Sequence, residues 1–230
     1  TVEGGDTPVT PDTPDGTATI YSRNFKTNDG GCTVTTSMAP STGKEVWTRD
    51  VKYGWVGTAF SNNKAYAADA SLTTPELDLT GMESAKLTFH HAVNYCSSPS
   101  QLLSVEVVYS DGDDDIAEKL NDVTWPAGND WKFVSSGDID LTPYVGGKIR
   151  IRFHYTSTDS KAGTWEISDM EGTGKRTATA IGSPSAPLSS GFDPNKPYEV
   201  YDLSGVRLSS IERGHGVVVV RQGGRSWKVV

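Results

Sequence analysis

The feature that most constrains the fold is a two-residue alternation of apolar and polar side chains in three segments, residues 85–92, 103–109 and 148–155. The clearest segment sets four side chains expected to face a core against three expected to face solvent: Ile149, Ile151, Phe153 and Tyr155 against Arg150, Arg152 and His154. A period of two is typical of a strand with one wet face. Antiparallel sheets tolerate such strands better than parallel sheets do. The alternation therefore predicts antiparallel sheet.

Shorter strands are expected around these three segments, and turns are expected between them. The candidate strands are residues 19–22, 45–48, 56–60, 64–68 and 163–169, and no segment shows a persuasive helical period. The 24 glycines and 12 prolines supply the turns, as at residues 110–113, 126–129 and 145–147. Many short antiparallel strands predict an all-β fold, a jelly-roll β-sandwich over residues 18–171.

The two ends of the chain differ from this block in composition. Residues 1–17 are rich in Thr, Pro, Asp and Gly, and such a segment is expected to act as a flexible linker. Residues 172–196 read as a second linker. Residues 197–230 predict a small three-stranded β module, which is too short for an independent core, and Trp227 is expected to anchor it.

Net charge and hydropathy argue against two classes of protein, those that bind nucleic acid and those that cross a membrane. The formal net charge is −8, carried mainly by residues 17–171, which argues against nucleic-acid binding because that needs clustered Lys and Arg. No apolar run is long enough to be a transmembrane segment, and no signal peptide is present. A linker-like start predicts a secreted or outer-membrane surface protein, lipid-anchored before trimming in the second case.

Five ordered segments resemble the choice-of-anchor J and DUF5017-like jelly-roll domains of Bacteroidetes, relatives of cleaved-adhesin, MAM-like and galactose-binding-like sandwiches. They are residues 72–80 (LTTPELDLT), 86–92 (KLTFHHA), 131–142 (WKFVSSGDIDLT), 149–155 (IRIRFHY) and 164–167 (TWEI). The resemblance implies a non-catalytic part of an adhesin, a glycan-handling protein or a surface protease. It also implies that Trp131 and Trp165 are core residues.

The C-terminal segment resembles a second Bacteroidetes pattern. Residues 200–205 (VYDLSG), 216–220 (GVVVV) and 228–230 (KVV) are similar to C-terminal modules, some of which are secretion-sorting domains. Gly214, His215 and Gly216 stand where that pattern has Gly, an aliphatic residue and Tyr. The resemblance implies placement at the surface or outside the cell.

Catalytic motifs are missing from the sequence. The four histidines show no HExxH spacing, and there is no GxSxG elbow or P-loop. His91 is expected to be a hydrogen-bonded core histidine. Glu106, Glu166 and Asp169 lie on or near strands, but their spacing selects no glycosidase pair. The sequence predicts a non-enzymatic module binding glycan or surface protein; an ancillary domain of a secreted glycosidase or protease, or a structural spacer, stays open.

Aromatic side chains near turns are the candidate binding residues. Tyr53, Trp55 and Trp125 lie in or beside turn-rich stretches, and we expect them to be exposed. Sugars stack their C–H faces on such rings while their hydroxyls bond polar neighbours, as in pockets that combine aromatic and polar groups. Trp47 is expected in the core.

The acidic run at residues 111–115 is a candidate calcium site, and no other cofactor is indicated. Hard oxygen ligands on a turn suit calcium, but the Gly and the terminal Glu of an EF-hand are missing. The alternative is a solvated hairpin tip. The resemblance adds an acid near the final strand, which here is Asp169 after Ser168. The calcium candidates are Asp111, Asp113, Asp115 and Asp169.

The two cysteines, Cys32 and Cys96, allow one intramolecular disulfide. A bridge fits an oxidising compartment. The alternative is a pair of unrelated buried thiols.

Overall fold

The computed structural model describes residues 16–112, 114–176, 196–201, 206–208, 218–223 and 225–229, which form two compact units divided near residue 177. Strands and connecting loops make up this part of the chain, together with two 3₁₀ turns, η1 (Pro99–Gln101) and η2 (Thr142–Tyr144). Over the same residues, no helix has the length and apolar character needed to cross a membrane. The described residues confirm the predicted all-β fold.

The first sheet of the large unit has seven antiparallel strands in the order β12-β9-β15-β4-β3, with β1 also pairing with β15 and β13 with β9. Their bounds are β1 (Thr17–Asn24), β3 (Trp47–Asp50), β4 (Gly54–Thr58), β9 (Met82–Asn94), β12 (Val134–Ser135), β13 (Ile139–Asp140) and β15 (Thr164–Arg176).

The second sheet has six strands in the order β11-β10-β14-β7-β2, with β8 pairing with β14. Their bounds are β2 (Thr33–Met38), β7 (Ala68–Thr73), β8 (Leu77–Asp78), β10 (Leu103–Asp111), β11 (Asp114–Lys119) and β14 (Lys148–Ser157). A separate hairpin joins β5 (Phe60–Ser61) to β6 (Lys64–Ala65). Its turn residues Asn62 and Asn63 have φ of 52° and 57°, as a type I′ turn requires.

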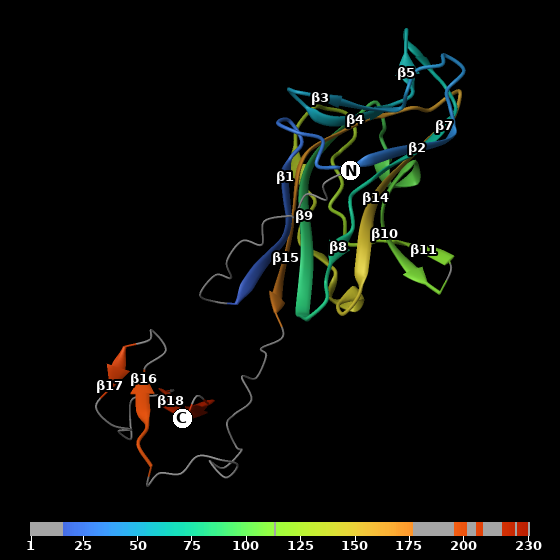
Figure 1. Ribbon diagram of the computed structural model, residues 1–230. Helices are drawn as coiled ribbons and strands as arrows, with labels where there is room; N and C mark the ends of the chain where they lie inside the picture. The colour runs from blue at the N-terminus through green and yellow to red at the C-terminus, as the bar shows by residue number, and fades with distance from the viewer. Residues whose placement is uncertain are drawn as a thin grey trace, which may run out of the picture. The chain divides into compact units, whose positions relative to one another are not determined.

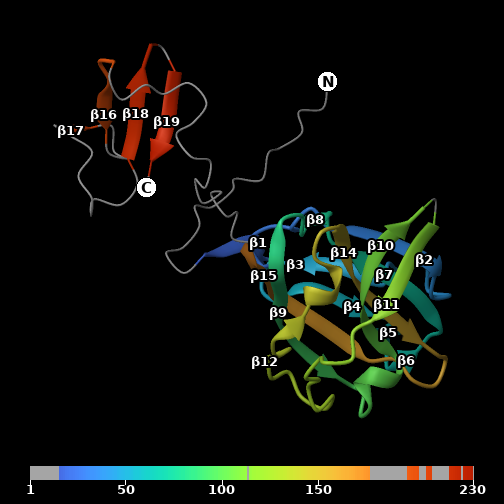
Figure 2. The same cartoon turned by 90° about the horizontal axis from the view of Figure 1, so that it is seen from below.

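The two sheets pack face to face (Figures 1 and 2). The alternating side chains form one core between them. Ile149, Ile151, Phe153 and Tyr155 of β14 are all at most 2% exposed. Phe153 contacts Phe89 of β9 edge to face at 5.2 Å and Trp165 of β15 at 5.6 Å. Rings from both layers thus share one core, which is the predicted β-sandwich.

The sandwich continues past residue 171, where the sequence predicted its end. Strand β15 runs to Arg176 because both of its neighbours continue beside it: Lys175 lies opposite Thr17 of β1 and Ser84 of β9. The small and polar residues at the end of β15 hid this extension, since they show little alternation.

The described residues of the small unit form a sheet of four strands in the order β17-β16-β18-β19, one more than predicted. Its strands are β16 (Glu199–Tyr201), β17 (Arg207–Leu208), β18 (Val218–Gln222) and β19 (Arg225–Val229). Strand β17 has only two residues, so alternation could not reveal it. The small core of this unit consists of Val200, Val218, Val220 and Leu208. The Trp227 side chain, residues 214–216 and most of both predicted linkers lie outside the described residues.

Candidate functional site

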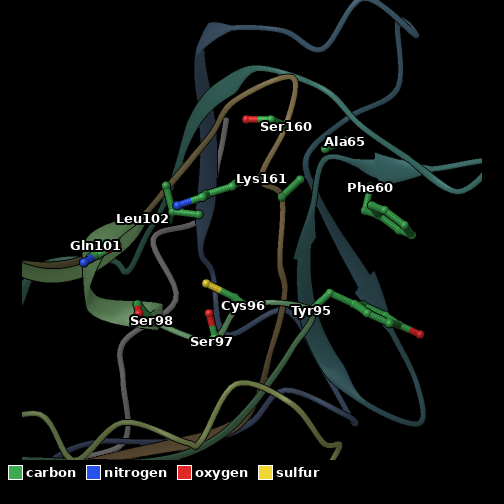
Figure 3. A pocket seen from close by; sticks show the side chains of 11 residues that line it. Phe60, Ala65, Tyr95, Cys96, Ser97, Ser98, Gln101, Leu102, Ser160 and Lys161 are labelled. Carbon is green, nitrogen blue, oxygen red and sulfur yellow. The ribbon is translucent and has the colours of Figure 1, made fainter.

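A pocket of about 220 Å³ opens at one end of the sandwich, where β9 ends (Figure 3). It is assembled from the β5–β6 hairpin, the turn after β9, η1 and the loop between β14 and β15. Its lining residues are Phe60, Ala65, Tyr95, Cys96, Ser97, Ser98, Gln101, Leu102, Ser160, Lys161 and Ala162. Aromatic rings lie along one side and polar side chains along the other, with Cys96 between them. Such a mixture is typical of small-ligand sites.

Three aromatic side chains form a cluster that we call the pocket cluster: Phe60 and Tyr95, which line the pocket, and Trp131, which contacts Tyr95. The Phe60 and Tyr95 rings stack at 5.4 Å, and Trp131 meets Tyr95 edge to face at 5.8 Å. Tyr95 is 59% exposed and Trp131 46% exposed. Single exposed apolar residues are ordinary, whereas adjacent ones mark a binding surface. The pocket cluster is therefore the main candidate binding surface.

The backbone at Tyr95 is strained. Its φ is 61°, a left-handed conformation that is rare for a bulky residue and costs about 1–3 kcal/mol. The Tyr95 N–H donates a 2.8 Å hydrogen bond to the Oδ1 of Asn94, which supports this conformation. Strain of this kind clusters at functional sites.

Close backbone packing at Cys96 brings Trp131 to Tyr95. The Cys96 N–H donates to the Gly128 carbonyl at 2.8 Å. Gly128 has a φ of 80°, and a Cβ there would lie 1.7 Å from the Cys96 carbonyl oxygen. A Cβ on Gly163 would lie 2.7 Å from the Cys96 Cβ. Both positions therefore require glycine, and the loop that carries Trp131 is fixed beside the end of β9.

The polar side of the pocket offers free hydrogen-bonding groups. The side chains of Ser97, Ser98 and Gln101 form no hydrogen bond with another described residue, so they are available to a ligand. Burial raises the pKa of the Cys96 thiol, which keeps the thiol protonated and makes it a weak nucleophile. The pocket is thus suited to binding polar groups rather than to thiol chemistry.

The aromatic residues predicted to bind lie away from this pocket. Tyr53 is 37% exposed, as expected, and Lys52 lies over its ring at 5.0 Å. Trp55 is only 8% exposed, and its indole N–H donates to the Asp29 carbonyl at 3.1 Å. Trp125 is half-buried against the core, 5.4 Å from Trp165. The expectation of exposure is therefore wrong for Trp55, because its indole N–H finds a partner within the fold.

Trp131, assigned to the core by the family resemblance, is exposed instead. It lies in the loop between β11 and β12 rather than on a strand, so no pleat directs its ring inward. Tyr95 was missed altogether. The sequence signal was the aromatic residue just after a long alternating strand, followed by the polar turn CSSPS of residues 96–100.

The acids considered for a glycosidase pair lie in different surroundings. Glu106 is on β10 of the second sheet and accepts from Arg152 Nε at 2.6 Å. Burial opposes its ionisation, but hydrogen bonds from His154, Ser104 and Arg152 outweigh this and lower its pKa to about 2. Glu166 and Asp169 belong to β15 of the first sheet.

Those two acids of β15 also differ from each other. Asp169 Oδ1 pairs with His90 Nδ1 at 2.8 Å. Glu166 is 5% exposed, and burial raises its pKa. Glu106 therefore lies in one sheet and Glu166 and Asp169 in the other, and the three acids do not line a common pocket in the described part of the chain.

His91 is a neutral histidine of the core, as predicted. It is fully buried, its Nδ1 accepts from the Trp165 indole N–H at 3.2 Å, and its Nε2 contacts the Thr124 carbonyl at 3.0 Å. The Nε2 must therefore carry the proton and donate it. Burial lowers the pKa of His91 to about 4. The histidine ties the core to the loop after β11.

The calcium candidates are not gathered in one place. Asp115 on β11 accepts from Arg150 at 2.6 Å, whereas Asp169 lies in the other sheet. Asp111 ends β10, and Asp113 lies outside the described residues. Within the described part of the chain, no three His, Cys, Asp or Glu side chains come together as metal ligands. Calcium binding at these residues stays a prediction.

The disulfide prediction is wrong, because both cysteines are free. Cys32 lies in the loop between β1 and β2, where its sulfur is 4.0 Å from the Tyr21 hydroxyl. Cys96 lines the pocket at the end of β9. The alternative of two unrelated thiols therefore describes the structure.

A scan against protein-family models finds no match, and a search of curated proteins finds no relative. Among solved structures, the K3 cleaved-adhesin domain of Lys-gingipain from Porphyromonas gingivalis is similar over 69% of this chain and 99% of that one, at 16% identity and a TM-score of 0.42. A xylan-binding domain of Paenibacillus barcinonensis Xyn10C is similar over 70% and 96%, at 13% identity and a TM-score of 0.39.

A cyclase from Fischerella is also similar, over 68% of this chain and 90% of that one, at 16% identity and a TM-score of 0.34. The similarities thus extend to an enzyme as well as to adhesin and carbohydrate-binding domains. At these identities they concern the β-sandwich fold, and function rests on the residues of this chain.

Proposed function

We propose that the large unit is a non-catalytic extracellular or cell-surface module that binds a glycan at the pocket cluster. The observation that carries the proposal is the pair of exposed rings, Tyr95 and Trp131, beside a polar pocket. A sugar ring can place its C–H face on an aromatic ring while Ser97, Ser98 and Gln101 bond its hydroxyls. The sequence resemblance to choice-of-anchor J domains agrees with this role.

The strain at the site favours a binding role over a purely structural spacer. A spacer needs neither a bulky residue at positive φ nor two adjacent exposed rings, and both features reduce stability or solubility. A module that binds polysaccharide beside a hydrolase on the same chain has the same requirement for exposed rings. The proposal therefore covers both a free-standing binding protein and an ancillary domain of a secreted hydrolase.

The test is a glycan array followed by calorimetric titration of the best glycan with the full chain and two variants, Tyr95→Ala and Trp131→Ala. Truncating a central binding aromatic typically costs 2 kcal/mol or more, so each variant should bind at least ~10-fold more weakly. Melting curves establish that the variants remain folded.

Tyr53→Ala is the matched control, because Tyr53 is another exposed aromatic residue, and its ring lies under Lys52 rather than against the pocket cluster. It should bind like the unaltered protein. The proposal fails if the array shows no glycan, or if Tyr53→Ala loses binding while Tyr95→Ala and Trp131→Ala keep it. The second outcome would place the binding site at Tyr53, one of the residues that the sequence suggested.

A further inference from the structure

The charge at the pocket narrows the class of ligand, on the premise that the proposed glycan site is correct. Lys161 is the one charged side chain among the lining residues, and the lining contains no Asp or Glu. The whole sequence, by contrast, has 29 acids and 21 Lys and Arg. We infer that the pocket takes an acidic saccharide, a sugar whose carboxylate meets the Lys161 ammonium while its ring lies on the pocket cluster.

The backbone of Lys161 is held at the rim of the pocket by a tight turn. Its N–H donates to the Oγ1 of Thr158 at 3.0 Å, and Thr158 N–H donates to its carbonyl at 2.9 Å. Ala162, the next residue, is 5% exposed and packs into the core. The base of the Lys161 side chain is therefore fixed, although the side chain itself is exposed.

The ammonium of Lys161 is available to a ligand. It forms no ion pair or hydrogen bond with any described residue, whereas Lys86 and Lys148 each contact an acid, at 2.8 and 2.7 Å. The nearest acid in sequence, Asp159, is engaged elsewhere: its Oδ1 accepts from the Ala67 N–H at 3.1 Å. No carboxylate of the pocket lining competes for Lys161.

The neutral groups beside Lys161 also suit a carboxylate. The hydroxyls of Ser97 and Ser98 and the amide of Gln101 can donate hydrogen bonds, and they share the pocket with Lys161 (Figure 3). A carboxylate that accepts from an ammonium and from neutral donors makes charge-assisted hydrogen bonds, about twice as strong as neutral ones. A neutral sugar would leave the ammonium unpaired, so the pocket discriminates in favour of the acidic one.

The experiment compares two acidic probes with neutral counterparts, using calorimetric titration of the full chain. Oligogalacturonate is paired with its carboxyl-reduced form, and 3′-sialyllactose with lactose; the two pairs distinguish internal uronic acids from terminal sialic acids. The unaltered protein should bind the acidic member of one pair about 10-fold more tightly. Lys161→Gln should remove this preference, while Lys161→Arg should retain it.

Lys64→Gln is the matched control. Lys64 is exposed and lies on β6 beside the pocket, but it does not line it. The substitution changes the net charge equally, so a preference that it also removes would reflect the general field of the protein and overturn the inference.

The remaining outcomes separate the two proposals. Three outcomes overturn the inference alone, provided that Trp131→Ala still weakens binding at least ~10-fold: equal binding of acidic and neutral partners, a preference that survives in Lys161→Gln, or array hits restricted to neutral glycans. Absence of binding to every glycan on the array overturns the proposed function and the inference together.

Discussion

Two clusters of aromatic side chains in the sandwich differ in what holds them. The first, which we call the core cluster, consists of Phe89, Phe153 and Trp165, each at most 1% exposed and each on a paired strand. The pocket cluster of Phe60, Tyr95 and Trp131 lies at the sandwich end, and its two largest rings are 59% and 46% exposed. The first is held by the pleat of two sheets and the second by turns and closely packed glycines.

This difference predicts that the core cluster contributes mainly to stability and the pocket cluster mainly to binding. A core ring fills space that nothing else can fill, so its removal leaves a cavity. A ring of the pocket cluster covers little buried surface, so its removal should affect a ligand more than the fold. Four measurements test that contrast.

The largest expected effect is in the core cluster. Phe153→Ala should destabilise the large unit by about 3–5 kcal/mol, because the lost contacts and the new cavity add, while Trp131→Ala should cost less than ~1 kcal/mol. Urea unfolding curves for both variants measure the difference. If Trp131→Ala lost more than ~2 kcal/mol, the pocket cluster would be part of the structural core and the contrast would disappear.

The second effect is the acid sensitivity of the core at His91. Its pKa is about 4 in the folded protein against 6.5 for the free side chain, so between these values the unfolded chain binds a proton that the folded one does not. Stability should therefore fall by about 1.4 kcal/mol per pH unit from pH 6.5 to 4, a total of roughly 3 kcal/mol. Above pH 6.5 His91 is neutral in both states, so stability no longer depends on its titration.

The check on His91 is the difference between unfolding free energies of the unaltered protein and His91→Gln across this pH range. Taking the difference removes the titration of the carboxylates common to both. A constant difference from pH 7 to 4 would mean that His91 takes up its proton as readily in the folded as in the unfolded state, contrary to the effect expected from its burial.

A smaller effect is expected at the glycine that fixes the pocket loop. Gly128→Ala should cost about 1–3 kcal/mol, because φ is 80° and the new Cβ would meet the Cys96 carbonyl at 1.7 Å. Gly146→Ala is the control: φ is 87° there, but nothing lies within 4 Å. Thermal unfolding should show a larger loss for Gly128→Ala. Equal losses would show that the contact with Cys96 contributes nothing.

The smallest of the four concerns the hydroxyl that joins the core to the pocket loops. Tyr155 Oη donates to the Gly163 carbonyl at 2.7 Å and accepts from the Ala59 N–H at 3.0 Å. Tyr155→Phe should cost about 1–2 kcal/mol, because both backbone groups lose a partner. Hydrogen exchange at the Ala59 amide should become faster; unchanged protection would indicate that water replaces the hydroxyl.

Prediction from the sequence succeeded where the physical cause was local and failed where it was not. The burial of Phe153 and His91 followed from alternation within one strand, and the burial of Trp165 was implied by the family resemblance. The exposure of Trp131 was not predicted, because its ring lies in a loop where no pleat directs it inward. The burial of Trp55 was not predicted either, because it depends on a partner far along the chain, the Asp29 carbonyl that accepts its indole N–H. The sequence also could not decide whether Cys32 and Cys96 pair, because pairing depends on where the fold places each of them. Both are free, and they lie in different parts of the sandwich.

The amino-acid sequence by itself determined that this protein is a β-sandwich and which side chains of its alternating strands face the core, since a strand turns successive residues to opposite faces whatever lies beyond it. Only the tertiary structure decided where a ligand can bind. The pocket joins Phe60 of β5, Tyr95 from the turn after β9 and Lys161 from the loop between β14 and β15. Their meeting depends on how two sheets end and on the close contact of Gly128 with Cys96, and no local pattern encodes such a contact.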